Sequence, residues 1–227
     1  MPVGGLIVGA GASRRAGFDK VFAPLAGQPV LAHSLRAFVA CLYVDRVVVV
    51  LSANNLEHGR QLVDAGNWTK VVRVCLGGER RQDSVAAGLA ALSSCDWVVI
   101  HDAARPLVTP ELITRGLAEA ELTGAAIAAV PVTDTIKVVG PDMVVGSTPV
   151  RSSLWAVQTP QVFRYDLITA AYVGATGEYT DDASVLEQLG HPVRVFEASQ
   201  ENLKITHPGD LELAEFLLRR RQCPGSA

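Results

Sequence analysis

The chain alternates short, almost wholly apolar runs with amphipathic segments, a pattern typical of α/β proteins. Val3–Val8 and Arg46–Leu51 are apolar nearly throughout, as strands buried on both faces of a parallel sheet should be. Between such runs, Val85, Leu89 and Leu92 recur at helical spacing. The succession of strand, loop and helix therefore predicts a parallel sheet covered by helices on both faces.

The same pattern places the remaining elements. Further strands are predicted at Lys70–Cys75, Trp97–Ile100, Ala125–Val130, Pro192–Phe196 and Leu203–Thr206. Helices are predicted at Pro29–Ala40, Asn54–Asp64, Arg80–Leu92, Pro110–Leu122, Arg164–Val173, Asp182–Leu189 and Pro208–Arg220, with Thr109 capping the fourth. Together they describe a Rossmann-like three-layer sandwich with a mostly parallel central sheet. In such sheets, ligands bind beyond the carboxyl ends of the strands.

The alternation breaks at Pro131. Two apolar segments, 135–139 and 143–146, flank the turn sequence Gly140-Pro141-Asp142. They predict a β-hairpin arm at about residues 132–155, inserted in a single domain that spans residues 1–227. A small projecting arm cannot bury its own apolar side chains, so we expect a second copy of the chain to cover them in a homodimer.

Composition narrows the class of protein. The 227 residues are 49% hydrophobic, enough for a sizeable core, and the net charge of −3 offers no general attraction for nucleic acid. No apolar run reaches membrane length and no basic region precedes the first one, so we expect a cytoplasmic protein without membrane or nucleic-acid partners. The four cysteines are widely spaced, which favours free thiols, and the five histidines show no zinc-ligand spacing.

The loop from Gly9 to Lys20 directly follows the first strand and is rich in glycine and basic residues. Glycines let backbone N–H groups approach a phosphate closely, while Arg15 and Lys20 supply positive charge. The loop lacks the dinucleotide fingerprint, because Arg14 stands at the third glycine position, and it lacks the Gly-Lys-Ser/Thr of a P-loop. It therefore predicts phosphate handling of a kind that suits an enzyme acting on a nucleoside triphosphate.

Three more polar clusters follow predicted strands. In Gly77–Val85, the paired glycines permit close backbone approach and Ser84 could bind a base, unless the segment is only a turn and a helix cap. In His101–Pro106, Asp102 could bind ribose hydroxyls or Mg²⁺ and Arg105 an anion, unless the two form a structural ion pair. His101 itself is interpreted as structural. The last cluster is distributed over Thr135, Arg151, Thr180-Asp181-Asp182 and Lys204.

These clusters carry a resemblance to a known family. From Val3 to about Leu218 the chain resembles the 2-C-methyl-D-erythritol 4-phosphate cytidylyltransferases of non-mevalonate isoprenoid synthesis. The matching motifs, in family order, are His101–Pro106, Pro131–Lys137, Thr159–Gln161, Thr180–Ser184 and Asn202–Thr206. The resemblance implies a Mg²⁺-dependent nucleotidyltransferase that joins CTP and methylerythritol phosphate, releases pyrophosphate and dimerises through its arm.

The resemblance also implies roles for individual residues. The catalytic residues would be Arg15, Lys20 and Lys204, which would stabilise charge on the phosphates. CTP would contact Ala10, Gly11, Gly78, Ser84, Asp102 and Ala103, and Asp102 could also meet the metal. The acceptor would contact Arg105, Thr180 and, from the partner's arm, Thr135 and Arg151.

Two alternatives remain at this level. A sister cytidylyltransferase acting on ribitol 5-phosphate or another polyol phosphate would keep the CTP half unchanged. Only the acceptor residues Thr135, Arg151 and Thr180 would then differ in their contacts. A nucleotide-binding module without catalysis would be expected to lack Arg15, Lys20 or Lys204, and all three are present.

Overall fold

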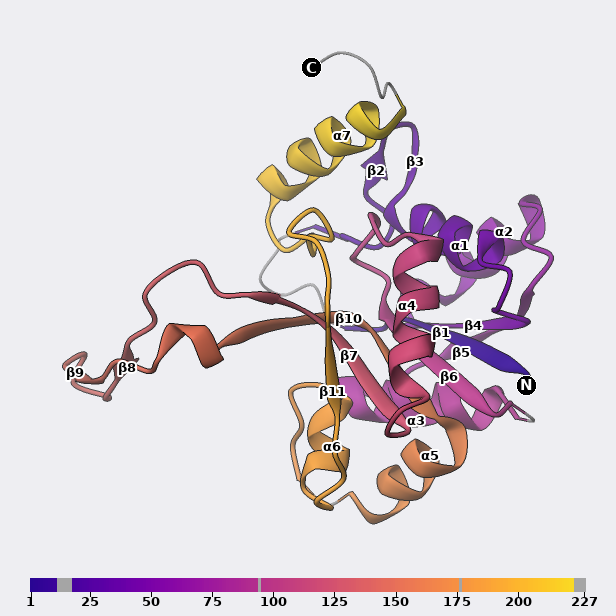
Figure 1. Cartoon of the computed structure of the whole chain (residues 1–227). Coiled ribbons are helices and arrows are strands. Elements are labelled where there is room, and N and C mark those ends of the chain that lie inside the picture. Colours follow the sequence, from indigo (N-terminus) through magenta and orange to yellow (C-terminus); the bar gives the residue numbers. More distant parts are fainter. Residues whose placement is uncertain (12–17, 94, 176, 223–227) are drawn as a thin grey trace.

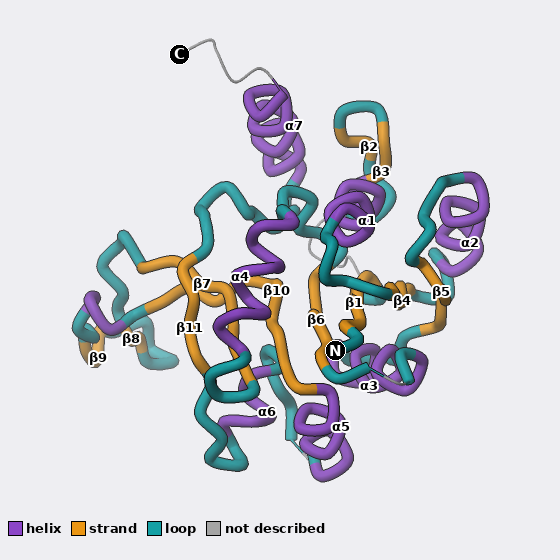
Figure 2. Tube along the Cα trace, turned by 45° about the vertical axis from the view of Figure 1, so that its right-hand side comes forward, coloured by secondary structure: helices purple, strands orange, loops and turns teal. Residues whose placement is uncertain are grey.

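The computed structural model describes residues 1–11, 18–93, 95–175 and 177–222. Its centre is a seven-stranded sheet in the order β11-β7-β10-β6-β1-β4-β5, which Figure 2 shows from left to right. The strands are β1 (Val3–Gly9), β4 (Arg46–Leu51), β5 (Val71–Leu76), β6 (Trp97–Asp102), β7 (Ala125–Pro131), β10 (Trp155–Arg164) and β11 (Arg194–Glu197). All neighbours pair in parallel except β10, which runs antiparallel to both β6 and β7. The predicted mostly parallel sheet is confirmed.

Helices cover both faces of the sheet (Figure 1). They are α1 (Val30–Ala40), α2 (Leu56–Ala65), α3 (Arg81–Ala91), α4 (Pro110–Ala120), α5 (Tyr165–Gly174), α6 (Ala183–Glu187) and α7 (Pro208–Gln222). One apolar layer includes Phe38 of α1 and Ile113 of α4, and the layer on the other face includes Leu89 of α3 and Ile168 of α5. Alternating strand residues feed the two layers, because successive side chains on a strand point to opposite faces.

The seven predicted helices are all present, with ends shifted by a few residues. Thr109 caps α4 as expected, since its hydroxyl accepts the N–H of Leu112 at 3.3 Å and Pro110 stands at the first position. Helix α7 packs against a small hairpin, β2 (Pro24–Leu25) and β3 (Gln28–Pro29), in a third apolar cluster that includes Leu25 and Leu217. The three-layer architecture therefore carries one extra apolar cluster beyond its two main layers.

The sequence did not predict β10, and one predicted strand is wrong. Strand β10 enters the middle of the sheet and its residues contribute Val162 and Phe163 to opposite layers. Residues Leu203–Thr206 form no strand, because the Ile205 N–H bonds to the Ala104 carbonyl at 2.8 Å while the Thr206 N–H bonds to Asp210. This segment lies against the loop after β6 instead of pairing with a strand.

The predicted hairpin arm is present. Strands β8 (Val138–Val139) and β9 (Val145–Ser147) pair antiparallel at its tip, and Figure 1 shows the arm projecting away from the body of the molecule. The 3₁₀ turn Arg151–Ser153 leads back into β10. Most of the arm's apolar side chains are exposed, including Met143 and Val144. The arm therefore has no apolar core of its own, as the sequence predicted.

No helix in the described part of the chain is long and apolar enough to cross a bilayer. Cys41, Cys75 and Cys95 are free thiols, and Cys41 and Cys95 are buried. The fourth cysteine, Cys223, lies outside the described residues.

Candidate active site

The carboxyl ends of β1 and β6 bring two of the predicted clusters together, because these parallel strands are neighbours and Val8 pairs with Asp102. Two adjoining cavities open at this edge of the sheet. The small cavity, of about 100 Å³, is lined by Val8, Gly9, Gly11, Lys20, Val21, Arg81, Asp102, Ala104 and Lys204. The larger cavity, of about 410 Å³, is lined mainly by residues of β10 and by residues of α6 and the segment before it, and it shares Arg81, Asp102 and Lys204 with the small one. These three side chains form the wall between the cavities.

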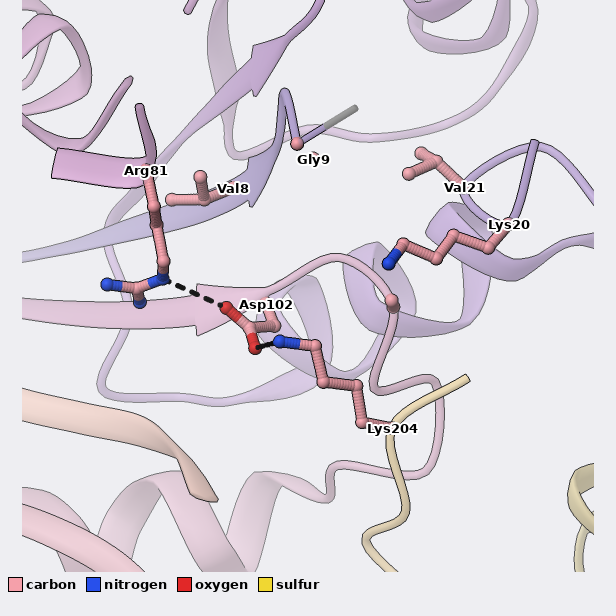
Figure 3. Close-up of a pocket in the computed structure, with 9 residues that line it drawn as sticks. Val8, Gly9, Lys20, Val21, Arg81, Asp102 and Lys204 are labelled. Atoms are coloured by element: carbon pink, nitrogen blue, oxygen red, sulfur yellow. Dashed lines mark hydrogen bonds and ion pairs between the residues drawn. The ribbon is translucent and has the colours of Figure 1, made fainter. Parts of the chain in front are cut away.

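We call Asp102 and the three cations around it, Arg81, Arg105 and Lys204, the Asp102 cluster. The Lys204 ammonium donates to Asp102 Oδ2 at 2.6 Å, and Arg81 Nε faces Oδ1 at 3.4 Å, as Figure 3 shows. Arg105 Nε lies 4.0 Å from Oδ2. One nearly buried carboxylate thus orients three positive side chains that come from three separate segments.

The electrostatics of Asp102 follow from this surrounding. Burial alone would raise the pKa of its carboxyl, but the ammonium of Lys204 and the guanidinium of Arg81 hold that pKa well below its ordinary value. Burial lowers the pKa of Arg105, because only the 4.0 Å contact with Asp102 offsets the loss of water around its guanidinium. Asp102 is therefore an anion at every physiological pH, and it serves as the counter-ion for the cluster.

His101 holds the turn that carries Asp102 and Arg105. Its ring is fully buried, with Nδ1 2.9 Å from the Thr159 hydroxyl and Nε2 3.1 Å from the Arg105 carbonyl. Thr159 Oγ1 accepts the N–H of Asp102 at 3.1 Å, so its hydroxyl hydrogen is available for Nδ1 of the ring. Burial lowers the pKa of His101 to about 4, and the ring is neutral. The histidine is structural, as predicted, and it braces the Asp102 backbone.

The loop after β5, which contains Gly77 and Gly78, packs closely against Ala10 and Ser84. A side chain at Gly77 would lie 2.4 Å from Cβ of Ala10 and 2.7 Å from the Ser84 hydroxyl, so only glycine fits between them. Ser84 is buried, and its hydroxyl accepts the N–H of Gly78 at 3.2 Å. Ser84 therefore shapes the Gly78 backbone, whereas the sequence suggested that it could bind a base directly.

Lys20 extends its ammonium into the small cavity, toward the Asp102 cluster (Figure 3). Gly11 lines the same cavity, and apart from its chain neighbours no described residue lies within 4 Å of the place where a side chain would start. Ala10 and Ala103, which the resemblance also assigned to CTP, are buried and do not line this cavity. Arg15, which the sequence placed among the catalytic residues, lies outside the described residues.

The larger cavity contains the two body residues predicted to contact the acceptor, Arg105 and Thr180. Arg105 Nη1 donates to the Asn202 carbonyl at 2.7 Å, while its buried Nε makes no hydrogen bond with the described residues. The segment after Thr180 is fixed by Gln161 of β10, whose amide donates to Asp181 and whose carbonyl accepts the N–H groups of Asp182 and Ala183. Arg105 lines the larger cavity, and a guanidinium with an unused donor is suited to pairing with an anionic ligand.

Thr135 and Arg151 do not join these residues within one chain. Both are exposed on the arm, and Arg151 Nη1 donates to the Thr133 carbonyl at 3.0 Å. Neither lines the two cavities. One chain thus leaves the two arm residues apart from the predicted residues that line the two cavities, which are Gly11, Lys20, Asp102, Arg105, Thr180 and Lys204.

Two site residues were missed at the sequence level, although both lie in clusters that the sequence singled out. Arg81 lines both cavities, and its terminal nitrogens donate to the buried carboxylate of Asp182 at 2.8 and 2.7 Å. The two residues are 101 positions apart, so no local pattern could pair them. The signal available was only that both flank candidate ligand-binding segments.

Among the described residues, no group of three or more histidines, cysteines and acidic residues could hold a metal ion. Asp102 lines both cavities, and Asp181 and Glu187 also line the larger one. One carboxylate on the nucleotide side is compatible with Mg²⁺ brought by a nucleotide, because this ion commonly takes most ligands from phosphate oxygens and water.

Comparisons with known proteins agree with the geometry. The 2-C-methyl-D-erythritol 4-phosphate cytidylyltransferase family matches residues 3–220. Enzymes of that name from Dehalococcoides mccartyi and Symbiobacterium thermophilum are 50% and 48% identical, and the matches cover 96% and 98% of this chain and 96% of each relative.

Solved structures extend the likeness to the fold. The 4-diphosphocytidyl-2C-methyl-D-erythritol synthase from Anaerococcus prevotii superposes with a TM-score of 0.85 at 27% identity, over 96% of both chains. The 2-C-methyl-D-erythritol 4-phosphate cytidylyltransferase from Thermus thermophilus gives 0.75 at 33% identity, over 94% of this chain and 98% of the other. The match is nearly end to end in sequence and in structure. The chain therefore belongs to the 2-C-methyl-D-erythritol 4-phosphate cytidylyltransferase family.

Proposed function

We propose that the protein transfers the cytidylyl group of CTP to 2-C-methyl-D-erythritol 4-phosphate and releases pyrophosphate. Membership of the family supports this activity, as do the names of relatives that are 41–50% identical. Within the molecule, the proposal rests on the Asp102 cluster, whose cations stand between two adjoining cavities. Joining two phosphate-bearing substrates requires positive charge at the place where they meet.

CTP would occupy the side of the wall that Lys20 and Gly11 line. The loop that carries Arg15 and Lys20 would hold the phosphates, because backbone N–H groups near glycine and basic side chains both favour anions. The base would lie near Ala10, Gly78 and Ser84, and the ribose near Asp102 and Ala103. The support for this placement is that Gly9 and Gly11, on either side of Ala10, line the small cavity, and that Ala10 and Ser84 pack around the Gly77–Gly78 loop.

The acceptor would occupy the larger cavity. Its phosphate would pair with Arg105, whose Nε is an unused buried donor, and it would contact Thr180. The exposed arm of one chain would bring Thr135 and Arg151 to the site of a second copy. The exposed apolar surface around Val144 supports this homodimer, because a partner would remove it from water.

The chemistry needs no nucleophilic side chain. A phosphate oxygen of the acceptor attacks the α-phosphorus of CTP, the bond from that phosphorus to the β-phosphate oxygen breaks, and pyrophosphate leaves. Lys204, Arg15 and Lys20 would stabilise the negative charge that the transition state spreads over these oxygens. In the Asp102 cluster, three positive charges face Asp102 and the Asp182 carboxylate bound to Arg81, which leaves one net positive charge for the substrates.

Mg²⁺ would be held by triphosphate oxygens, with Asp102 as the protein carboxylate nearest to them. When bound, it would supply further neutralisation of the departing pyrophosphate. To receive the ion, Asp102 would exchange part of its pairing with Lys204 or Arg81.

Pyrophosphate release from CTP and Mg²⁺ tests the function, with methylerythritol 4-phosphate and ribitol 5-phosphate as separate acceptors. We expect release with the first and little with the second. Release only with ribitol 5-phosphate would keep the reaction type and replace the acceptor. If the folded protein releases no pyrophosphate with either acceptor, the proposed activity is wrong.

A further inference from the structure

Behind the Asp102 cluster lies a second, more deeply buried ion pair. Arg81 grips Asp182 with both terminal nitrogens, and the Asp182 side chain is 0% exposed. Tyr172 of α5 completes the group, donating its hydroxyl to Asp182 Oδ1 at 2.6 Å. Burial and the neighbouring Asp182 carboxylate raise the pKa of Tyr172, so its hydroxyl keeps its proton and remains a donor. Every oxygen of Asp182 is thus engaged.

The grip on Asp182 determines how Arg81 can approach Asp102. A guanidinium is planar and its donors point in fixed directions. With both terminal nitrogens turned to Asp182, only Nε faces Asp102, at a long 3.4 Å (Figure 3). Burial alone would lower the pKa of Arg81, but the two carboxylates raise it, so the charge is permanent. Asp182 therefore limits how strongly Arg81 binds Asp102 and leaves Oδ2 to Lys204.

The pair also joins the two sides of the site. Arg81 is the first residue of α3, directly after the Gly77–Gly78 loop. Asp182 precedes α6 and lies two residues beyond Thr180, in the segment that Gln161 anchors to β10. The ion pair between Arg81 and Asp182 links these two segments, and it therefore fixes the distance between the small cavity and the larger one.

We propose that Asp182 and Tyr172 are positioning residues for the nucleotidyl transfer, acting through Arg81 to orient Asp102 and to hold the Thr180 segment in register with the nucleotide side. The inference rests on the proposed function. Stability alone does not account for the pair, because burying two charges costs solvation that their attraction does little more than offset. The guanidinium of the Arg81–Asp182 pair also reaches Asp102, so the pair is better explained by the orientation that it imposes on Arg81 and Asp102.

Two tyrosines on one helix provide a matched test. Tyr165 also lies on α5, and its hydroxyl donates a partly buried hydrogen bond to the Leu89 carbonyl at 2.7 Å. Tyr165 lines neither of the two cavities. Each variant, Tyr172→Phe and Tyr165→Phe, removes one hydroxyl from one hydrogen bond. We expect Tyr172→Phe to lower kcat about tenfold, the lower end of the cost of losing one hydrogen bond to a charged group, while Tyr165→Phe leaves turnover unchanged. Equal kinetics for the two variants would overturn the proposal.

The charges are tested by Asp182→Asn alone and together with Arg81→Gln. The single variant leaves Arg81 free to turn its terminal nitrogens to Asp102, and we expect CTP affinity, measured by calorimetry, to fall about tenfold to a hundredfold. It also removes one of the two carboxylates that offset the buried charge of Arg81, so its Tm should fall. The double variant removes both charges, and we expect its Tm to recover while CTP affinity and kcat remain low.

Comparing Tm with CTP affinity and kcat in the two variants distinguishes a positioning role from a purely structural one. If activity and affinity return together with Tm in the double variant, the pair is merely structural and the proposal fails. The wild-type protein is assayed first with both acceptors, so a failure of the proposed function is seen there, independently of any variant. Calorimetry with CTP alone then judges the pair even when no acceptor is turned over.

Discussion

The Asp102 cluster and the arm differ in how far a single chain satisfies their side chains. In the cluster, one chain supplies both signs of charge, and Asp102, Lys204, Arg81 and Asp182 are paired before any ligand arrives. On the arm, Met143 is 82% exposed and Val144 62% exposed, and the arm's own pairing is a short two-strand ladder. Under the proposed function, this comparison predicts that one chain supplies the charges of the nucleotide side, while the acceptor side takes surface from a second copy.

The largest expected effect tests the cationic half. Lys20→Ala should reduce kcat about 10²-fold to 10³-fold, the usual cost of removing one donor that stabilises transition-state charge. Steady-state pyrophosphate release measures it. Lys70→Ala is the matched control, because Lys70 donates to the Cys41 carbonyl at a distance from the site. Turnover of Lys20→Ala near that of Lys70→Ala would remove Lys20 from the mechanism.

The second effect tests how firmly His101 braces the cluster. Its pKa is about 4 in the folded protein against 6.5 as the ordinary value, so the unfolded chain binds more protons between these values. The free energy of unfolding should therefore fall as pH decreases from 6.5 to 4, and the share due to His101 should be about 3 kcal/mol. Urea titrations across this range measure it.

His33 also has a pKa lowered by burial and contributes in the same direction, so the comparison must be made between variants. His101→Gln should flatten the pH dependence, while His207→Gln, at an exposed position, should leave it unchanged. Parallel curves for His101→Gln and the wild type would show that the ring takes no part in this linkage.

The third effect asks whether the arm completes a partner's site. Arg151→Ala should raise the KM for the acceptor about tenfold to a hundredfold, since a hydrogen bond from a charged group is lost. Mixing it with Lys20→Ala should restore activity, because each mixed dimer would contain one site with Lys20 from one chain and Arg151 from the other. No recovery after demonstrated subunit exchange would place Arg151 in the site of its own chain or in neither.

The smallest effect concerns the apolar surface of the arm. Val144→Ser should raise the dimer dissociation constant about tenfold, which corresponds to losing the burial of one valine side chain. Sedimentation equilibrium measures it. Val173→Ser on α5, at a position that is 86% exposed, is the control and should leave the association unchanged. Identical constants for both variants would argue against the arm as the dimer contact.

The sequence predicted the elements whose signal is local and missed those whose stability comes from distant partners. Apolar runs such as Val3–Val8 and capping at Thr109 lie within one element, and both are confirmed. Strand β10 contains Thr159-Pro160-Gln161, which interrupts its apolar pattern, and its place between β6 and β7 depends on pairing over long separations. The segment Leu203–Thr206 was predicted as a strand from its apolar residues, but its Ile205 packs in the third apolar cluster and bonds to the Ala104 carbonyl in the loop after β6.

The same division holds for the site. Asp102, Arg105, Lys20 and Lys204 follow strands or occur in recognisable motifs, and the structure gathers them at two cavities. Their electrostatic organisation was not predictable, because it depends on Asp182, a residue that reaches Arg81 from 101 positions away. Motifs can name the charged residues, but only the folded chain shows which of them neutralise one another.

The pairing of β7 with β10 has a consequence for how the arm could be exchanged. Pro131 and Trp155 are register partners across these antiparallel strands, and the Val132 N–H beside them bonds to the Leu154 carbonyl at 3.1 Å. The arm is therefore topologically a long loop of an ordinary β-hairpin. Its two attachment points lie side by side, and a short turn could join them without disturbing the strands on either side. We therefore expect that the arm can be shortened, replaced or transplanted as a unit. The sheet edge that carries Asp102 would keep its own connections.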